Sequence, residues 1–476
     1  MTTSAPAATA GRRDAGPRTH SRWLALGLLC LAQFMLILDV TVVNVALPDI
    51  GAGLHLDRPT LAWVLTAYTL VFGGLMLLGG RLADLFGARR VLLAGLAVFT
   101  GASLLSGLAT GAPLLIGGRI AQGAGAALLS PAALSLVTTT FTGAERNKAL
   151  GIWAALAGAG SAAGVVLGGV LTSGPGWRWI FFINVPVGLL VLAALPVMVA
   201  ASRRQPGRAR VDVPGALTVT AATGAAIYGL ISAGSHGWLS ASTLIPLGAA
   251  AVLYLMFAAV ERAVAAPLMD LRMLTRRPVA AGAFLMLVAT GLLVGGFFLG
   301  SFYLQQHRGY SALHTGLSFL PVVAAIILGS HTASRAVTRL DGRVLTAGAL
   351  ALAAAGAAVA AHWAGPVALV TGLSVAALGI GATFVAAFTT ALSRIDPGQA
   401  GVGSGIVNTF HELGGAIGVA VVSSIAAPSL AAASLSSAGF TRAFTFSAAA
   451  ALAAAALAAL IVPAGKAPAG AMPHAH

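Results

Sequence analysis

The stretch MLILDVTVVNVALP, residues 35–48, carries a carboxylate, Asp39, and an amide, Asn44, inside a run of apolar side chains. The apolar run is long enough to lie in lipid, where a charge at the centre of a helix costs roughly 2.5–3.5 kcal/mol. Charged side chains are rare in such positions and usually have a function. The stretch therefore predicts a membrane helix with an ionisable group in its interior.

The composition of the whole chain is typical of a membrane protein. Of the 476 residues, 58% are hydrophobic and 8% are charged, and the mean hydropathy is +0.93. A soluble domain is about a quarter charged. The net charge of +15 is spread singly between apolar runs, with no basic patch that contains aromatic residues, so it does not indicate nucleic-acid binding. The one cysteine, Cys30, excludes an intramolecular disulfide.

Segments that can cross a membrane follow one another along most of the chain. A transmembrane helix needs about 20 apolar residues, and 14 segments are predicted on this basis. They lie near residues 22–47, 61–80, 91–110, 113–139, 149–172, 178–200, 213–233, 241–260, 280–304, 311–331, 343–363, 366–391, 403–427 and 440–463.

The basic residues predict the orientation. An even number of spans puts both termini on one side, and lysine and arginine collect in cytoplasmic loops. The loops on the side of the termini contain 22 of the 27 basic residues, the other loops contain 4, and Arg119 lies within a span. Both termini and the loop 201–212 are therefore predicted to be cytoplasmic. The tails, 1–21 and 464–476, are rich in small and polar residues and are expected to be disordered.

The spans group into two sets of six. Residues 22–200 and 280–463 are each expected to form a six-helix bundle, and residues 201–279 form a linker with two extra transmembrane helices. Two bundles around a central cavity are the common architecture of secondary transporters. The predicted fold is all-α.

Five strings occur in the order and at the places that one transporter family uses. They are LDVTVVNVALP (38–48), GRLADLFGARR (80–90), RIAQGAGAA (119–127), GSAAGVVLGG (160–169) and AGVGSGIVNTFHELGGAIG (400–418). Together they resemble the motifs of the major facilitator superfamily, specifically its 14-helix drug:proton antiporters (the DHA2 group). The resemblance covers nearly the whole chain. One position departs from it: Val165 stands where the family usually has proline.

The resemblance implies a function and two groups of residues. It implies an exporter in a bacterial inner membrane that moves drug-like or antibiotic molecules in exchange for protons by alternating access. The loop at 80–90 would be a cytoplasmic gate, and the glycines of 160–169 would seal one bundle against the other. The gate residues are Gly80, Asp84, Gly87, Arg89 and Arg90, and the glycine face is Gly160, Gly164, Gly168 and Gly169. Asp84 also lies where it could cap the helix that follows it.

Three of the 39 charged residues lie in the interior of predicted spans, away from the span ends: Asp39, Arg119 and Glu412. At 1.5 Å per residue, Asp39 and Arg119 lie roughly 12 Å and 9 Å from the outer face, so the two can pair. A proton on Asp39 would then release Arg119, which couples charge to helix movement. We therefore expect these residues to take part in proton coupling, and the alternative is an ion pair with a purely structural role.

Glu412 lies roughly 14 Å deep, close to the midplane. Ser404, Asn408 and His411 precede it at helical spacing and share its face. We expect Glu412 to carry a proton or to bind a cationic drug, and the alternative is a polar stripe that only faces a watery cavity. The substrate cavity is expected to include Asn44, Gln122, Ser404, Asn408 and His411.

Two other functions remain open from the sequence. One is a proton-coupled symporter for nutrient or metabolite uptake, and the other is a receptor, channel or scaffold that does not transport. Enzyme motifs are lacking, so we expect no enzyme activity, no cofactor and no metal. The expected partners are a small-molecule substrate, protons and the lipid bilayer, without nucleic acid, and the expected state is a monomer.

Overall fold

The computed structural model describes seven stretches of the chain. They are residues 19–56, 58–199, 212–264, 267–362, 365–393, 395–430 and 437–465. Most of the expected tails and of the loop 201–212 lie outside these stretches. Residues 19–21, which the sequence assigned to the N-terminal tail, are helical and open the first helix.

The described residues contain helices and no strand, as predicted for an all-α fold. The first bundle consists of α1 (Thr19–Leu54), α2 (Arg58–Phe86), α3 (Ala88–Gly107), α4 (Ala112–Thr140), α5 (Gly143–Ser173), the single turn α6 (Trp179–Phe182) and α7 (Asn184–Met198). A hairpin of two helices, α8 (Val213–His236) and α9 (Ala241–Ala263), follows it.

The second bundle begins after a short connector. Its elements are α10 (Arg272–Thr275), α11 (Arg277–Phe302), the π-helical turn η1 (Tyr303–His307), α12 (Ala312–Ser318), α13 (Leu320–Ala336), α14 (Gly342–His362), α15 (Pro366–Leu392), the 3₁₀ turn η2 (Pro397–Gln399), α16 (Ala400–Leu430) and α17 (Ala438–Ile461).

The number of spans agrees with the prediction. In the described part of the chain, 13 helical segments are long and apolar enough to cross a membrane. The long helix α5 lies at the place of the remaining predicted span. Proline in the first turn helps several of these helices to begin, because its missing N–H has no partner there in any case; α4, α8, α11, α13 and α15 begin in this way.

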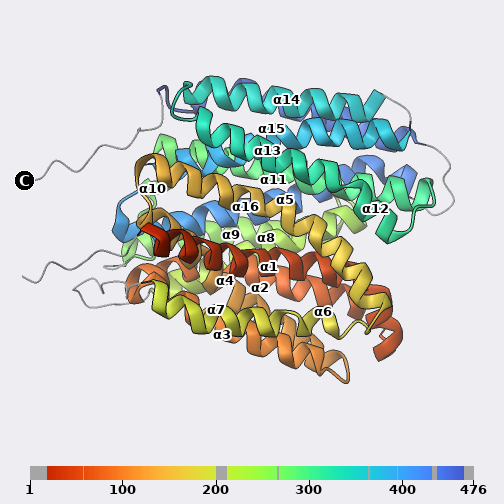
Figure 1. Cartoon of the computed structure of the whole chain (residues 1–476), viewed down its shortest axis with the longest axis horizontal. Coiled ribbons are helices and arrows are strands. Elements are labelled where there is room, and N and C mark those ends of the chain that lie inside the picture. The colour runs from red at the N-terminus through yellow and green to blue at the C-terminus, as the bar shows by residue number, and fades with distance from the viewer. Residues whose placement is uncertain are drawn as a thin grey trace, which may run out of the picture.

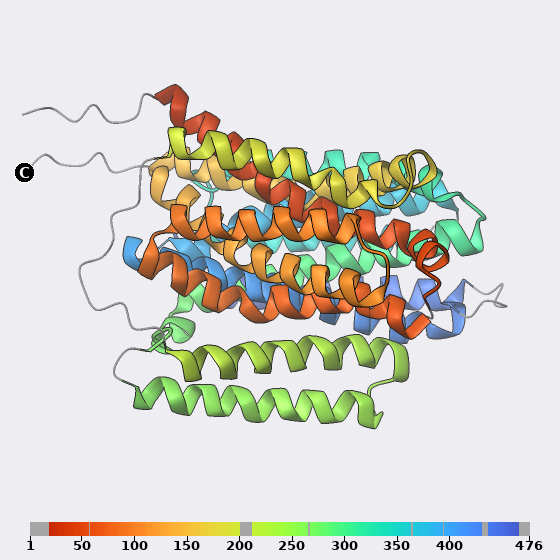
Figure 2. The same cartoon turned by 90° about the horizontal axis from the view of Figure 1, so that it is seen from below.

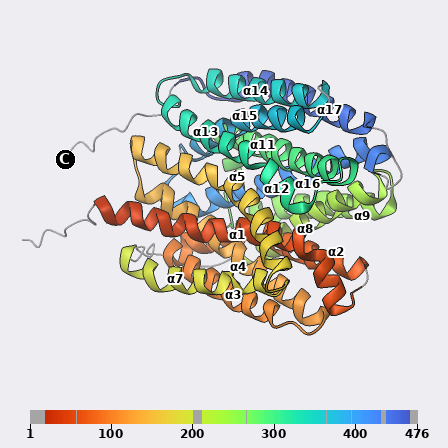
Figure 3. The same ribbon diagram turned by 45° about the vertical axis from the view of Figure 1, so that its right-hand side comes forward.

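The two bundles lie side by side with their helices roughly parallel to one axis (Figure 1). Figure 3 shows α1–α4 and α7 on one side and α13–α15 with α17 on the other. The most extensive contacts between the bundles are those of α2 with α16 and of α5 with α13. The first residues of α1 and the last residues of α17 lie at the same end of the molecule (Figure 1).

The α8–α9 hairpin lies beside the joined bundles rather than between them (Figure 2). Its helix α8 contacts both α2 and α16. At its turn, Trp238 Nε1 donates a hydrogen bond to Ser424 Oγ of α16 at 3.1 Å. The hairpin therefore covers one of the two seams where the bundles meet.

Glycine allows the helices within a bundle to approach closely. A Cβ atom on Gly95 of α3 or Gly125 of α4 would overlap the backbone of the other helix. Gly356 and Gly372 make the same kind of contact between α14 and α15. Close backbone approach through small residues is how helices associate in lipid, where no hydrophobic effect drives them together.

Candidate functional site

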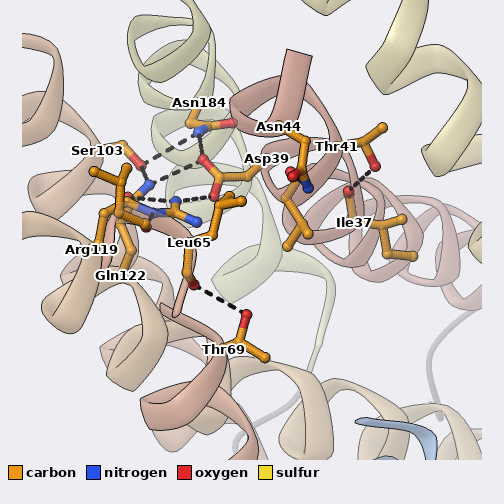
Figure 4. A network of polar contacts seen from close by, with 12 residues as sticks. Ile37, Asp39, Thr41, Asn44, Leu65, Thr69, Ser103, Arg119, Gln122 and Asn184 are labelled. Carbon is orange, nitrogen blue, oxygen red and sulfur yellow. Dashed lines mark hydrogen bonds and ion pairs between the residues drawn. The ribbon is translucent and has the colours of Figure 1, made fainter. Parts of the chain in front are cut away.

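The first part of the site is a buried ion pair inside the N-terminal bundle. Asp39 comes from α1 and Arg119 from α4, and Arg119 Nη1 lies 2.5 Å from Asp39 Oδ2 (Figure 4). Both side chains are 0% exposed. The pairing that the depth of the two residues predicted is therefore confirmed.

Two amides complete the coordination of the Asp39 carboxylate. Oδ1 accepts hydrogen bonds from Gln122 Nε2 at 3.1 Å and from Asn184 Nδ2 at 2.9 Å (Figure 4). Ser103 Oγ accepts a further bond from Gln122 Nε2 at 2.8 Å. Gln122, which the sequence placed in the substrate cavity, is instead a fully buried member of this network.

Arg119 is held from several sides. Its Nε donates to the carbonyl oxygen of Val64 on α2 at 3.0 Å, and its Cζ lies 4.3 Å from the centre of the Tyr68 ring. Such cation–π contact stabilises a guanidinium that has lost its water. Arg119 Nη2 and the Tyr68 hydroxyl are buried and have no hydrogen-bond partner in the described part of the chain.

Five helices, α1–α4 and α7, thus contribute to one network around the Asp39 carboxylate. A proton on Asp39 would cancel its charge and weaken every bond that the network makes to it. The Asp39 carboxylate therefore joins α1 directly to α4 and α7. Sequence reasoning missed Ser103, Asn184 and Tyr68, and the only available signal was that they are polar residues within apolar spans.

Asn44 lies one turn further along α1 and does not join this network. Its side chain is exposed and donates a hydrogen bond to the carbonyl oxygen of Val40 at 3.0 Å. In Figure 4, Asn44 lies apart from the atoms that surround Asp39.

The second part of the site is the polar stripe of α16. Asn408 Nδ2 donates to Ser130 Oγ of α4 at 3.4 Å, so the stripe faces the N-terminal bundle. Ser404 is fully buried there. Further along α16, His411 Nδ1 lies 3.3 Å from Glu412 Oε1, and these side chains are 34% and 19% exposed.

The third part joins the two bundles at the end of the molecule where α1 begins and α17 ends. Asp84, at the end of α2, accepts hydrogen bonds from the backbone N–H groups of Gly401 at 2.7 Å and Val402 at 2.9 Å. A carboxylate at the N-terminus of a helix is stabilised by the orphan N–H groups and the helix dipole. Asp84 does cap a helix, but that helix is α16 and not α3, which follows it in the sequence.

The other gate residues have different surroundings. Gly80 and Gly401 bring the backbones of α2 and α16 into direct contact. Gly87 has a φ of 91°, which suits glycine, and is the N-cap residue of α3. Arg89 Nη2 donates to the carbonyl oxygen of Pro196 on α7 at 2.9 Å, whereas Arg90 is exposed.

A further contact between the bundles was not expected from the sequence. Arg146, in the first turn of α5, donates from Nη2 to the carbonyl oxygen of Leu392 at 2.6 Å. Leu392 is the last residue of α15, and a cation is favourable at the C-terminus of a helix. The N-terminal bundle therefore holds α15 by its negative end and α16 by its positive end.

The glycine face of α5 packs within a bundle and does not seal one bundle against the other. Cβ atoms on Gly160, Gly164 and Gly168 would collide with Ile37, Thr41 and Val45 of α1. Gly169 has no described atom within 4 Å of such a Cβ. The side chain of Val165 is outside the described part of the structure.

The family follows from a comparison with family models. The model described as Major Facilitator Superfamily matches residues 29–419. The chain belongs to the major facilitator superfamily. Solved structures of the superfamily share its fold: the human organic anion transporter MFSD10 matches 92% of this chain and 98% of its own with a TM-score of 0.65 at 16% identity.

Another solved structure, that of the E. coli fucose:proton symporter, matches 92% of this chain and 99% of its own with a TM-score of 0.61 at 14% identity. Curated members of the superfamily are similar in sequence over most of the chain. The cephamycin export protein CmcT of Amycolatopsis lactamdurans is 37% identical, over 89% of this chain and 88% of its own. The puromycin resistance protein pur8 of Streptomyces alboniger is 39% identical, over 88% and 84%.

Proposed function

We propose that this protein is a secondary active exporter that moves drug-like or antibiotic molecules out of the cell in exchange for protons. Names of relatives support the substrate class, since they include export and resistance proteins for cephamycin, puromycin and lincomycin. The observation that supports proton coupling is the ion pair of Asp39 and Arg119. It is fully buried, and its network includes groups from five helices.

The proposed cellular location is the inner membrane of a bacterium, with both termini in the cytoplasm. The distribution of basic residues supports this orientation. In that orientation, the contacts of Asp84 and Arg146 close the cytoplasmic side. We propose domains at 22–200 and 280–463, joined by the linker 201–279, with cytoplasmic tails at 1–21 and 464–476, and a monomer as the working unit.

Transport begins, in this proposal, when a proton reaches Asp39 and neutralises it. The loss of charge weakens the bonds to Arg119, Gln122 and Asn184, so the helices of the N-terminal bundle can shift against one another. Asn44, Asn408, His411 and Glu412 would contact the substrate in the cavity between the bundles. Binding and release of the proton on opposite sides would then drive substrate outward.

Transport in inverted membrane vesicles tests the proposal. Acidifying the vesicle interior should drive uptake of an exported antibiotic, and dissipating the proton gradient should stop it. An uptake symporter would move its substrate in the opposite direction, with the proton. Vesicles that show no movement of any drug in a broad panel, with the protein present and folded, would favour a receptor or scaffold.

Glu412 allows a sharper test within this assay. If Glu412 carries a proton, Glu412→Gln should stop the export of neutral and cationic drugs alike. If it only recognises cations, the variant should lose cationic drugs and keep neutral ones. Wild-type transport of both classes with unchanged pH dependence would remove Glu412 from the mechanism.

A further inference from the structure

Two acidic side chains lie close together at the base of the α8–α9 hairpin, away from the sites described above. Asp212 is the N-cap residue of α8, Glu261 lies in the last turns of α9, and each residue is 6% exposed. Both side chains are turned toward Gly215 in the first turn of α8. A Cβ atom on Gly215 would overlap both Asp212 Oδ2 and Glu261 Oε1, so these two oxygens approach the same point. We call Asp212 and Glu261 the carboxyl pair.

The hydrogen bonds of the pair leave one oxygen without an N–H donor. Glu261 Oε1 and Oε2 accept from the backbone N–H groups of Leu268 at 3.2 Å and Met269 at 3.0 Å. Asp212 Oδ1 accepts from the N–H of Gly215 at 2.9 Å. Asp212 Oδ2 is buried and has no such partner in the described part of the chain. Because ionised carboxylates only accept hydrogen bonds, a hydrogen bond between Asp212 Oδ2 and the neighbouring Glu261 carboxyl would need a proton.

Charged groups on the neighbouring described elements do not neutralise the pair. Arg262 on α9 and Arg272 on α10 are exposed. Asp270, on the connector between α9 and α10, is also exposed and accepts from the N–H of Arg272. On α2, Asp84 binds the start of α16, and Arg81 is half-buried beside the connector. The ion pairs among the described residues include neither Asp212 nor Glu261.

We propose that the carboxyl pair is a proton-binding site in which one proton is held between Asp212 Oδ2 and Glu261 Oε1. Two buried like charges in contact cannot both ionise readily, and one shared proton removes the conflict. The proton would join the first turn of α8 to the connector through Glu261, which holds the backbone of Leu268 and Met269.

The same contacts link the pair to the cytoplasmic gate. Leu268 and Met269 pack in one apolar cluster with Val402 of α16. Val402 is also the residue whose backbone N–H binds Asp84. Loss of the proton would make the pair repel and would free the connector, which removes packing from the base of α16. A rise in cytosolic pH would therefore loosen the gate from this side.

Hydrogen exchange of the Leu268 and Met269 amides tests the site in the full-length protein, reconstituted in lipid nanodiscs. After correction for intrinsic exchange, protection in the wild type should fall with rising pH, by up to about tenfold per pH unit once the proton leaves. In Asp212→Asn, the amide oxygen can still cap Gly215 and the amide nitrogen can donate to Glu261 permanently. This variant should remain protected and show no pH dependence.

Two further variants complete the design. Glu261→Gln should also lose the pH dependence, but with lower protection, because one backbone N–H loses its acceptor. Asp270→Asn, which removes an exposed acid from the same connector, should keep the wild-type profile. A flat wild-type profile, an Asp212→Asn profile equal to the wild type, or a profile set by sodium or potassium concentration would overturn the proposal. The measurement involves no transport, so its result is independent of whether the protein exports drugs.

Discussion

At the scale of single residues, Asp39 is stable in the bundle interior because donors surround its carboxylate. Arg119 supplies the opposite charge, and Gln122 and Asn184 supply amide N–H groups. A buried pair of this kind contributes little net stability, but breaking it by removing one partner leaves an uncompensated charge. The two halves of the pair are thus tied to one another energetically.

Arg119→Ala should destabilise the protein by roughly 3–5 kcal/mol, since it leaves the Asp39 carboxylate buried without its cation. Asp39→Asn should likewise leave Arg119 unpaired and should abolish proton-coupled export. The double variant Asp39→Asn/Arg119→Ala should lose less stability than the sum of the two single variants. Thermal unfolding of all four proteins measures this coupling, and strictly additive losses would show that the charges act independently.

At the scale of helices, α1 and α5 pack through glycines that have no room for a side chain. A Cβ atom on Gly164 would lie 2.5 Å from Thr41 Cβ, whereas Gly169 on the same helix has open space. The two positions share a helix, a motif and a residue type. Substitutions at the two positions therefore distinguish the loss of close packing against α1 from the loss of a glycine within α5.

Gly164→Ala should destabilise the protein by about 1–3 kcal/mol, because the added methyl group overpacks the contact with α1. Gly169→Ala should be neutral or slightly stabilising, since alanine restricts the unfolded chain without a clash. Melting temperatures in one detergent compare the variants directly. Equal losses in both would indicate that the α1–α5 contact does not depend on these glycines.

At the scale of the whole molecule, the N-terminal bundle holds the α15–α16 hairpin at both helix ends. Asp84 binds the N-terminus of α16 and Arg146 binds the C-terminus of α15. Each charge meets the helix end of opposite polarity. The two contacts come from different helices of the N-terminal bundle, and both hold the two bundles together at the same end of the molecule.

Asp84→Asn and Arg146→Gln should each open the cytoplasmic side more often, by about tenfold or more, because a hydrogen bond to a charged group contributes roughly 1.5–3 kcal/mol. The readout is thiol labelling, in inverted vesicles, of a cysteine at Ser130, which is buried between α4 and α16. Cys30 would be replaced by alanine. Arg90→Gln is the matched control: it removes an exposed charge from the same loop and should leave labelling unchanged.

The orientation of the molecule can be tested with one pair of exposed positions. Leu340, 44% exposed between α13 and α14, should lie in the cytoplasm, and Leu239, 89% exposed between α8 and α9, should lie outside. In a Cys30→Ala background, an impermeant maleimide added to whole cells should label cysteine at 239 and not at 340. The reverse pattern would invert the topology.

The spans and the depth of the charged residues follow from the sequence alone. In lipid every backbone polar group must be satisfied within its own helix, so apolar length alone defines the helices. Helical rise then placed Asp39 and Arg119 at matching depth, and that pairing was predictable.

The partners that the charged side chains find on other helices depend on the tertiary structure. Asp84 binds backbone groups more than 300 positions away, at Gly401 and Val402, and Arg146 binds the carbonyl of Leu392. Backbone N–H and C=O groups occur at nearly every residue and leave no mark in the sequence. The site of Asp212 and Glu261 was not predictable for a related reason. Each acid lies at the end of a span, where charge is ordinary, and only the fold of the hairpin brings the two close together.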